Sequence, residues 1–283
     1  MHEYYAEVKS IDFLFIGPQR TGTTWMYEML RRHPEIYVPE AVKETMFFDR
    51  YYERGLDWYR KYYREAGANQ LCGEVAPTYF DVPEVPARVH DVSPGCTIFI
   101  TLRHPVERAR SLFLHHLKKG RVSENFWEAA DQKPRVIDAG RYAEHIPRWT
   151  ATFGEDQLSF QFLEDIRNRP ETVLHAVQDT LGVEHMDPPE ERNESINATS
   201  MPRFPWLAKG AARLTTTLHE CGLHSLVKAA KKTGLKSLVY SGGEDRMPEL
   251  SSATRAALID EYEDDIAFLE KKTGRDLSHW RVP

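Results

Sequence analysis

The stretch 13–30 constrains the fold of this chain more than any other. It opens with four apolar residues, 13–16, which is typical of a buried parallel strand. A turn with two glycines follows, and residues 25–30 then place apolar side chains at helical spacing. This order predicts a phosphate site, because the amides and the dipole at a helix start attract anions. An ordinary strand–helix turn that happens to hold two glycines remains the alternative.

The turn comes close to the nucleotide-binding pattern G-x-x-x-x-G-K-[ST]. Gly17 and Gly22 have the spacing of its glycines, and Thr24 stands at the Ser/Thr position. The lysine is absent, because Thr23 occupies its place and the nearest cation is Arg20. We therefore expect a phosphate loop that serves a purpose other than ATP hydrolysis.

A second apolar run, residues 96–102, ends in Arg103, and a helix is expected to start near Pro105. Kinases and ATPases usually carry a magnesium-binding Asp at this strand end. An arginine suits a bare phosphate instead, because its planar fork binds two oxygens. Ser111 lies about two turns along the helix, which makes Arg103 and Ser111 candidates to bind one phosphate together. Taken alone, Arg103 also fits an exposed ion pair, and Ser111 a solvated hydroxyl.

Further apolar runs at 72–75 and 158–162 alternate with helical patterns along the chain. This alternation predicts one α/β domain over residues 1–283, with a P-loop-type doubly wound parallel sheet flanked by helices. Ligands of such sheets bind beyond the carboxyl ends of the strands, where the loops after residues 16 and 102 both carry arginine. An amphipathic pattern over 251–273 predicts a long C-terminal helix.

The composition excludes several classes of protein. A formal net charge of −6 gives no overall basic surface for nucleic acid, so an anion site has to be local. The three cysteines are widely spaced and odd in number, which fits a reducing compartment better than a disulfide framework. No apolar run reaches the ~20 residues of a membrane helix, and the N-terminus lacks a signal-peptide pattern. We therefore expect a cytoplasmic protein without a transmembrane segment; its oligomeric state stays open.

Four segments resemble the sulfotransferases that use 3′-phosphoadenosine 5′-phosphosulfate. Residues 19–25, Gln-Arg-Thr-Gly-Thr-Thr-Trp, are similar to the 5′-phosphosulfate loop of that family. Residues 103–111 are similar to its 3′-phosphate motif, Arg-x-Pro-x-x-Arg-x-x-Ser. Residues 43–48 and 74–79 resemble segments of its carbohydrate branch, the heparan sulfate type. The C-terminal residues also resemble the family, so the likeness touches nearly the whole chain, and we expect a bacterial member with a small-molecule acceptor.

The resemblance implies transfer of a sulfuryl group from that donor to a hydroxyl or amine of a small-molecule, lipid or sugar acceptor. Ten residues are implied to bind the donor: Gln19, Arg20, Thr21, Gly22, Thr23, Thr24, Trp25, Arg103, Ser111 and Arg203. Glu44 is implied to be the general base, and Arg20 the cation on the departing oxygen. His115 falls where N-sulfotransferases carry a histidine, although a structural role fits it equally well. No metal is implied, and no cluster of His, Cys or Asp has metal-ligand spacing.

The chain also departs from the family. Arg20 replaces the lysine of the phosphosulfate loop, Val75 replaces the lysine after Glu74, and the histidine base of the phenol and steroid enzymes has no counterpart. Two functional alternatives stay open: a P-loop kinase or ATPase, and a non-catalytic nucleotide-binding module. Alternatives for single residues also stay open: Trp25 as a core aromatic, and Glu44 as a surface carboxylate paired with Lys43.

Overall fold

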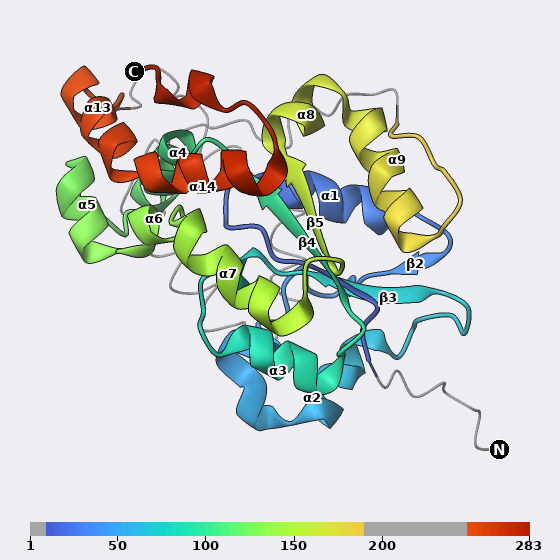
Figure 1. The fold of residues 1–283 in the computed structure, drawn as a ribbon. Helices are drawn as coiled ribbons and strands as arrows, with labels where there is room; N and C mark the ends of the chain where they lie inside the picture. Colours follow the sequence, from blue (N-terminus) through green and yellow to red (C-terminus); the bar gives the residue numbers. More distant parts are fainter. Residues whose placement is uncertain (1–9, 190–247) are drawn as a thin grey trace. The chain divides into compact units, whose positions relative to one another are not determined.

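The computed structural model describes residues 10–189 and 248–283 (Figure 1). In this part of the chain, five strands form one sheet in the order β2-β3-β1-β4-β5, and all of the pairs are parallel. The strands are β1 Phe13–Phe15, β2 Ile36–Tyr37, β3 Leu71–Val75, β4 Thr97–Leu102 and β5 Leu158–Phe162. The predicted doubly wound parallel sheet is confirmed, with β1 at its centre.

The helices surround the strands in chain order. They are α1 Thr23–Leu30, α2 Leu56–Arg60, α3 Val85–Val92, α4 Pro105–Lys118, α5 Phe126–Gln132, α6 Arg135–Asp138, α7 Tyr142–Phe153, α8 Leu163–Asn168, α9 Pro170–Leu181, α13 Ser252–Glu261 and α14 Glu263–Thr273. The prediction of one continuous helix over 251–273 was wrong, because the helix is interrupted at Tyr262 (φ −103°, ψ 11°). No Gly or Pro marks this break; the Tyr262 side chain is fully buried there.

The described residues belong to two compact units. The first holds the sheet and comprises Met1–Pro105, Ala139–Arg192 and Tyr262–Val282. The second comprises Val106–Asp138 and Asn193–Glu261, of which 248–261 are described. The single domain over 1–283 stays a prediction.

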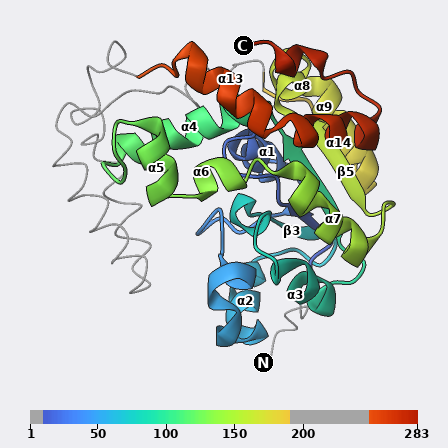
Figure 2. The ribbon, with the colours of Figure 1, turned by 60° about the vertical axis from the view of Figure 1, so that its left-hand side comes forward.

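Two hydrophobic clusters cover the two faces of the sheet in the first unit. Phe13 and Phe15 belong to the cluster that also holds residues of α1, α8 and α9. Leu14 and Ile16 belong to the other cluster, with residues of α3, α7 and α14. Figure 1 shows these two sets of helices on opposite faces of the sheet, and Figure 2 shows α3 beside α7 from another side. The alternation follows from the period of two along a strand.

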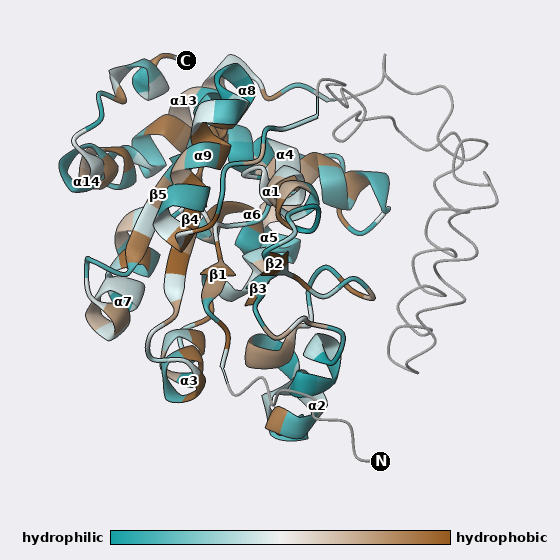
Figure 3. Ribbon diagram, turned by 90° about the vertical axis from the view of Figure 1, so that its right-hand side faces the viewer, coloured by the Kyte–Doolittle hydropathy of each residue, from teal (hydrophilic) through white to brown (hydrophobic). Residues whose placement is uncertain are grey.

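The central strands are hydrophobic on both faces, as Figure 3 shows for β1 and β4. Phe13, Phe15 and Phe99 are fully buried, and the rings of Phe15 and Phe99 stack at 4.4 Å between their centroids. Burial of each such side chain contributes roughly 1.5–3 kcal/mol. The apolar run that identified the first strand in the sequence therefore also fixes the place of the loop after it.

Candidate functional site

The loop after β1 is clamped against the neighbouring strand β4. A Cβ atom on Gly17 would lie 2.0 Å from Thr101 Oγ1, so only glycine fits there. The Thr21 hydroxyl lies 2.6 Å from Thr101 Oγ1 and donates to the carbonyl of Pro18 at 2.7 Å. Gly22 has φ +99°, in the left-handed region that favours glycine, and α1 begins at the next residue. Each glycine of the pattern thus has a steric reason.

The loop delivers the start of α1 to the carboxyl edge of the sheet. The first amides of any helix lack acceptors within the helix, and its dipole favours negative charge at this end. Arg20 lies in the same loop with φ +80°, a conformation that costs a non-glycine residue energy. Burial lowers the pKa of the Arg20 guanidinium, which remains a cation at any physiological pH. The loop therefore has the features of an anion site.

Arg103, at the end of β4, lies against this loop. Its Nη1 donates to the backbone carbonyl of Arg20 at 3.0 Å. The Tyr142 hydroxyl donates to the carbonyl of Arg103 at 2.7 Å and fixes the backbone there. The two arginine-bearing segments that the sequence placed at strand ends therefore meet, because β1 and β4 are adjacent parallel strands.

A lysine that the sequence suggested only as a partner of Glu44 reaches the same loop. Lys43 Nζ lies 3.3 Å from Thr23 Oγ1 and 3.4 Å from Thr24 Oγ1, at the start of α1. Its distance to Glu44 Oε1 is 3.7 Å, so the pairing considered as an alternative role for Glu44 is present. Burial is the main cause that lowers the pKa of Lys43. Through this neighbour, Glu44 belongs to the segment that borders the loop.

Glu74 anchors that segment from beneath. It is completely buried near the end of β3, and its Oε1 accepts a hydrogen bond from the Thr45 amide at 2.6 Å. The Tyr59 hydroxyl donates to Glu74 Oε2 at 3.0 Å, and the Tyr79 hydroxyl donates to Oε1 at 3.3 Å. Burial raises the pKa of Glu74 from 4.5 to about 7, against the lowering effect of these hydrogen bonds.

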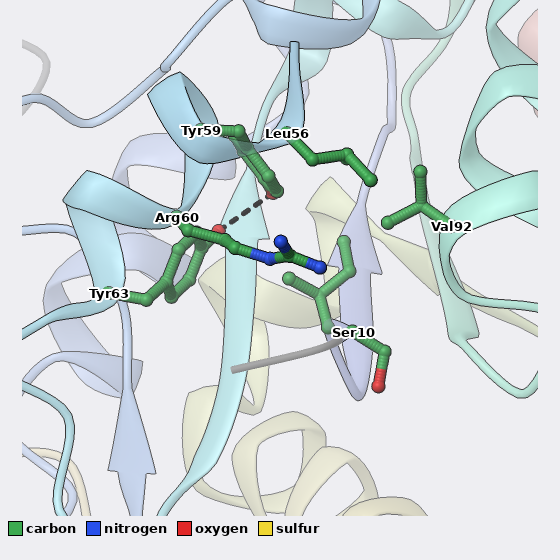
Figure 4. A pocket seen from close by; sticks show the side chains of 7 residues that line it. Ser10, Leu56, Tyr59, Arg60, Tyr63 and Val92 are labelled. Atoms are coloured by element: carbon green, nitrogen blue, oxygen red, sulfur yellow. Dashed lines mark hydrogen bonds between the residues drawn. The ribbon is translucent and has the colours of Figure 1, made fainter. Parts of the chain in front are cut away.

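The same network continues to a small pocket beside the residues that lead into β1. The hydroxyls of Tyr59 and Tyr63 lie 2.8 Å apart (Figure 4). The pocket is lined by Ser10, Ile11, Leu56, Tyr59, Arg60, Tyr63 and Val92. Since the loop follows β1, this pocket is not the phosphate site.

The aromatic residues after Glu44 mostly pack with one another. Phe47 and Phe48 are buried, as the sequence predicted, and Phe47 stacks on Tyr59 at 4.6 Å between centroids. Of the aromatic residues that the sequence left open as pocket or core, Tyr59 belongs to the core. Tyr51 and Trp58 are half-buried, and the Arg54 guanidinium lies over both rings.

The other predicted site residues lie as follows. Gln19 is half-buried in the loop, and Trp25 is half-buried on α1 and packs against the cluster behind β1, which is the alternative kept open for it. Ser111 and His115 are half-buried on α4 in the second unit, so their joint action with Arg103 or Glu44 stays a prediction. Arg203 lies outside the described residues.

The middle arginine of the predicted 3′-phosphate motif is structural. Arg108 is completely buried on α4, and its Nη2 donates to the carbonyls of Val136 at 2.6 Å and Ile137 at 3.2 Å. It therefore holds α4 against α6 within the second unit. Sequence spacing alone did not separate this arginine from a phosphate-binding one.

One group of possible metal ligands occurs among the described residues. Glu171 and His175 lie one turn apart on α9, and their ligand atoms and that of Asp187 lie within 4.8 Å of one another. The sequence did not predict this group, because Asp187 joins it only after the chain turns at Gly182. His175 Nε2 lies 2.8 Å from Asp187 Oδ1, and both carboxylates are exposed. An ion pair accounts for this arrangement, and we assign it no metal role.

Comparison with known proteins identifies relatives of this chain. Residues 10–204 match the sequence model of the family described as the sulfotransferase domain. The chain is 32% identical over 204 residues to human heparan sulfate glucosamine 3-O-sulfotransferase 6, a match that covers 69% of this chain and 58% of the relative. It is 30% identical over 292 residues to human bifunctional heparan sulfate N-deacetylase/N-sulfotransferase 3, covering 95% of this chain and 31% of the relative. The chain thus spans less than two thirds of the length of these relatives.

Solved structures show the same fold. A sulfotransferase from Alicyclobacillus acidocaldarius matches with a TM-score of 0.69 at 22% identity, over 97% of this chain and 100% of that one. Within residues 10–189 and 248–283, no helix is long and apolar enough to cross a membrane.

Proposed function

Because the chain belongs to the sulfotransferase family, we propose that it moves a sulfuryl group from 3′-phosphoadenosine 5′-phosphosulfate to a hydroxyl or amine. The acceptor is a small molecule, a lipid or a sugar. The observation that carries this proposal is the contact between Arg103 Nη1 and the Arg20 carbonyl at 3.0 Å. It joins two cationic segments beside a helix start, which suits a nucleotide with phosphates at both ends.

Binding of the donor uses both strand ends. Arg20, the amides at the start of α1 and the hydroxyls of the loop bind the 5′-phosphosulfate, with Gln19 and Trp25 beside them. Arg103 binds the 3′-phosphate together with Ser111 and, outside the described residues, Arg203. The 3′-phosphate is the group that distinguishes this donor from ATP.

Glu44 accepts the proton of the acceptor while the acceptor oxygen or nitrogen forms its bond to sulfur. The bond between sulfur and the bridging oxygen breaks, and negative charge grows on that oxygen as 3′-phosphoadenosine 5′-phosphate departs. Arg20 and the loop amides stabilise this charge, which is catalysis by positioning and by preorganised electrostatics. The Glu74 hydrogen bond to Thr45 supports this role, because it holds the residue next to Glu44 in place. His115 is the second candidate for the base.

A kinase or ATPase is supported less well. Thr23 stands where the P-loop lysine belongs, and β4 ends in Arg103 instead of an Asp that binds magnesium. We also infer a cytoplasmic setting. Cys72 and Cys96 are buried free thiols, which fits a reducing compartment; Cys221 lies outside the described residues.

A screen of candidate acceptors with isotopically labelled donor, followed by mass spectrometry, tests the proposal. We expect a product that is heavier by one labelled sulfuryl group, formed equally with and without EDTA. Transfer of phosphate from ATP that EDTA abolishes and magnesium restores would instead establish the kinase alternative. Binding of the nucleotide without any product across hydroxyl and amine acceptors would favour the non-catalytic module.

A further inference from the structure

Lys43 lies in a segment that is fixed on both sides. The Tyr27 hydroxyl, on α1, donates to the carbonyl of Pro39 at 2.8 Å. On the other side, the Thr45 amide donates to Glu74 Oε1 at 2.6 Å. The path of the chain between these two anchors carries the Lys43 side chain to the first residues of α1. Its ammonium group is therefore positioned by the fold and not by its own rotamers alone.

The surroundings of this ammonium group are unfavourable for a cation. It lies at the start of α1, the positive end of the helix dipole. Its contacts at 3.3 and 3.4 Å are to neutral threonine hydroxyls, and Glu44 Oε1 at 3.7 Å is beyond hydrogen-bond distance. Burial and the charge of Arg20 lower the pKa of Lys43, whereas Glu44 and Glu28 raise it. One acidic neighbour does not offset a second cation and a helix start.

An anion at the start of α1 would reverse each of these unfavourable terms. We propose that Lys43 is a donor-binding residue, whose ammonium group contacts the anionic group on the 5′ side of the nucleotide together with Arg20. This inference rests on the proposed function, because it assigns the 5′-phosphosulfate to the loop. It places the cation that the loop sequence lacks at Thr23 on a different segment, directly above Thr23. It also places a positive charge between the donor and the base Glu44.

Two nucleotides separate this role from a general structural one. 3′-Phosphoadenosine 5′-phosphate carries phosphates on both sides, whereas adenosine 3′-phosphate lacks the 5′ group. Lys43→Met removes the charge and keeps much of the apolar stem, Lys43→Arg retains a cation, and Lys61→Met is the matched control at an exposed lysine. Affinities are measured by calorimetry at one fixed salt concentration, and thermal melting checks that each variant folds.

We expect Lys43→Met to weaken binding of the bisphosphate about tenfold or more, as for a charge-assisted hydrogen bond, and to leave adenosine 3′-phosphate within about twofold. Lys43→Arg should recover most of the loss, and Lys61→Met should show none. Equal weakening of both nucleotides, or no weakening of either, would overturn the role of Lys43 while wild-type selectivity for the bisphosphate upholds the donor assignment. If the wild-type protein did not prefer the bisphosphate over 5′-AMP, the donor assignment and the role of Lys43 would both fail.

Discussion

The amide of Thr45 and the buried carboxylate of Glu74 are joined by a hydrogen bond of 2.6 Å. This bond ties the residue after Glu44 to the end of a central strand. Tyr59 and Tyr79 donate to the same carboxylate, so hydroxyls from two other segments converge on it. The base of the proposed reaction is thus held by a buried network and not by an exposed loop alone.

The titration of Glu74 gives the first prediction. Its pKa is about 7 in the folded protein and about 4.5 when the chain is unfolded. The folded state therefore binds the extra proton between these values. The contribution to stability is fully present below about pH 4.5 and is lost as the pH rises to about 7, a change on the order of 3 kcal/mol.

Denaturant unfolding at several pH values checks this expectation. Glu74→Gln carries no titrating group, so its free energy of unfolding should fall less between about pH 4.5 and about pH 7 than that of the wild type. Asp265, whose pKa burial raises to about 6, titrates in the same direction and remains in both proteins. The difference between the two curves therefore reports on Glu74, and parallel curves would show that its carboxyl group is not perturbed.

The sequence predicted the parts of the site that depend on strand ends. Gly17 and Arg103 follow apolar runs, and adjacent parallel strands bring their ends together. It did not predict the environment of Glu74, because the partners Thr45 and Tyr59 come from segments whose path no local pattern defines. For the same reason Lys43 was recognised only as a neighbour of Glu44. The break at Tyr262 was also missed, since a buried side chain and no Gly or Pro marks it.

Gly17 gives a steric prediction. A Cβ atom there would lie 2.0 Å from Thr101 Oγ1 and 2.4 Å from the Thr101 amide nitrogen, and backbone atoms cannot yield cheaply. We expect Gly17→Ala to lower the free energy of unfolding by about 3 kcal/mol or more. Gly95→Ala is the matched control, because a Cβ on Gly95 would have no atom within 4 Å. Similar unfolding midpoints for the two variants would contradict the close approach of the loop to β4.

Arg103 gives a prediction for donor recognition. The wild-type protein should bind 3′-phosphoadenosine 5′-phosphate more tightly than 5′-AMP by about 2 kcal/mol or more, as for hydrogen bonds to charged groups. Arg103→Ala should remove most of this difference, since the guanidinium at the end of β4 is lost. The exposed arginine at position 32 supplies the control, and Arg32→Ala should keep the selectivity. Calorimetric titrations with both nucleotides decide it; undiminished selectivity in Arg103→Ala would move the 3′-phosphate elsewhere.

Glu44 gives the most direct prediction for the chemistry. Its side chain is about one fifth exposed, beside Lys43, and the buried pair Phe47 and Phe48 anchors the chain that follows. As general base it should contribute roughly 10²–10⁴-fold to the rate. Glu44→Gln keeps the shape and removes the basicity, so this variant should fold, bind the bisphosphate nucleotide like the wild type and lose most of kcat.

The size of that loss should depend on the acidity of the acceptor. An alkyl hydroxyl needs its proton removed as the bond to sulfur forms, whereas a strongly acidic phenol is already largely ionised. We therefore expect Glu44→Gln to lose most of its turnover on an alcohol and far less on the phenol. Glu53→Gln, at an exposed glutamate, should match the wild type with both acceptors. Turnover of Glu44→Gln near the wild-type rate on the alcohol would assign the base to another residue, and His115 would be the first to replace.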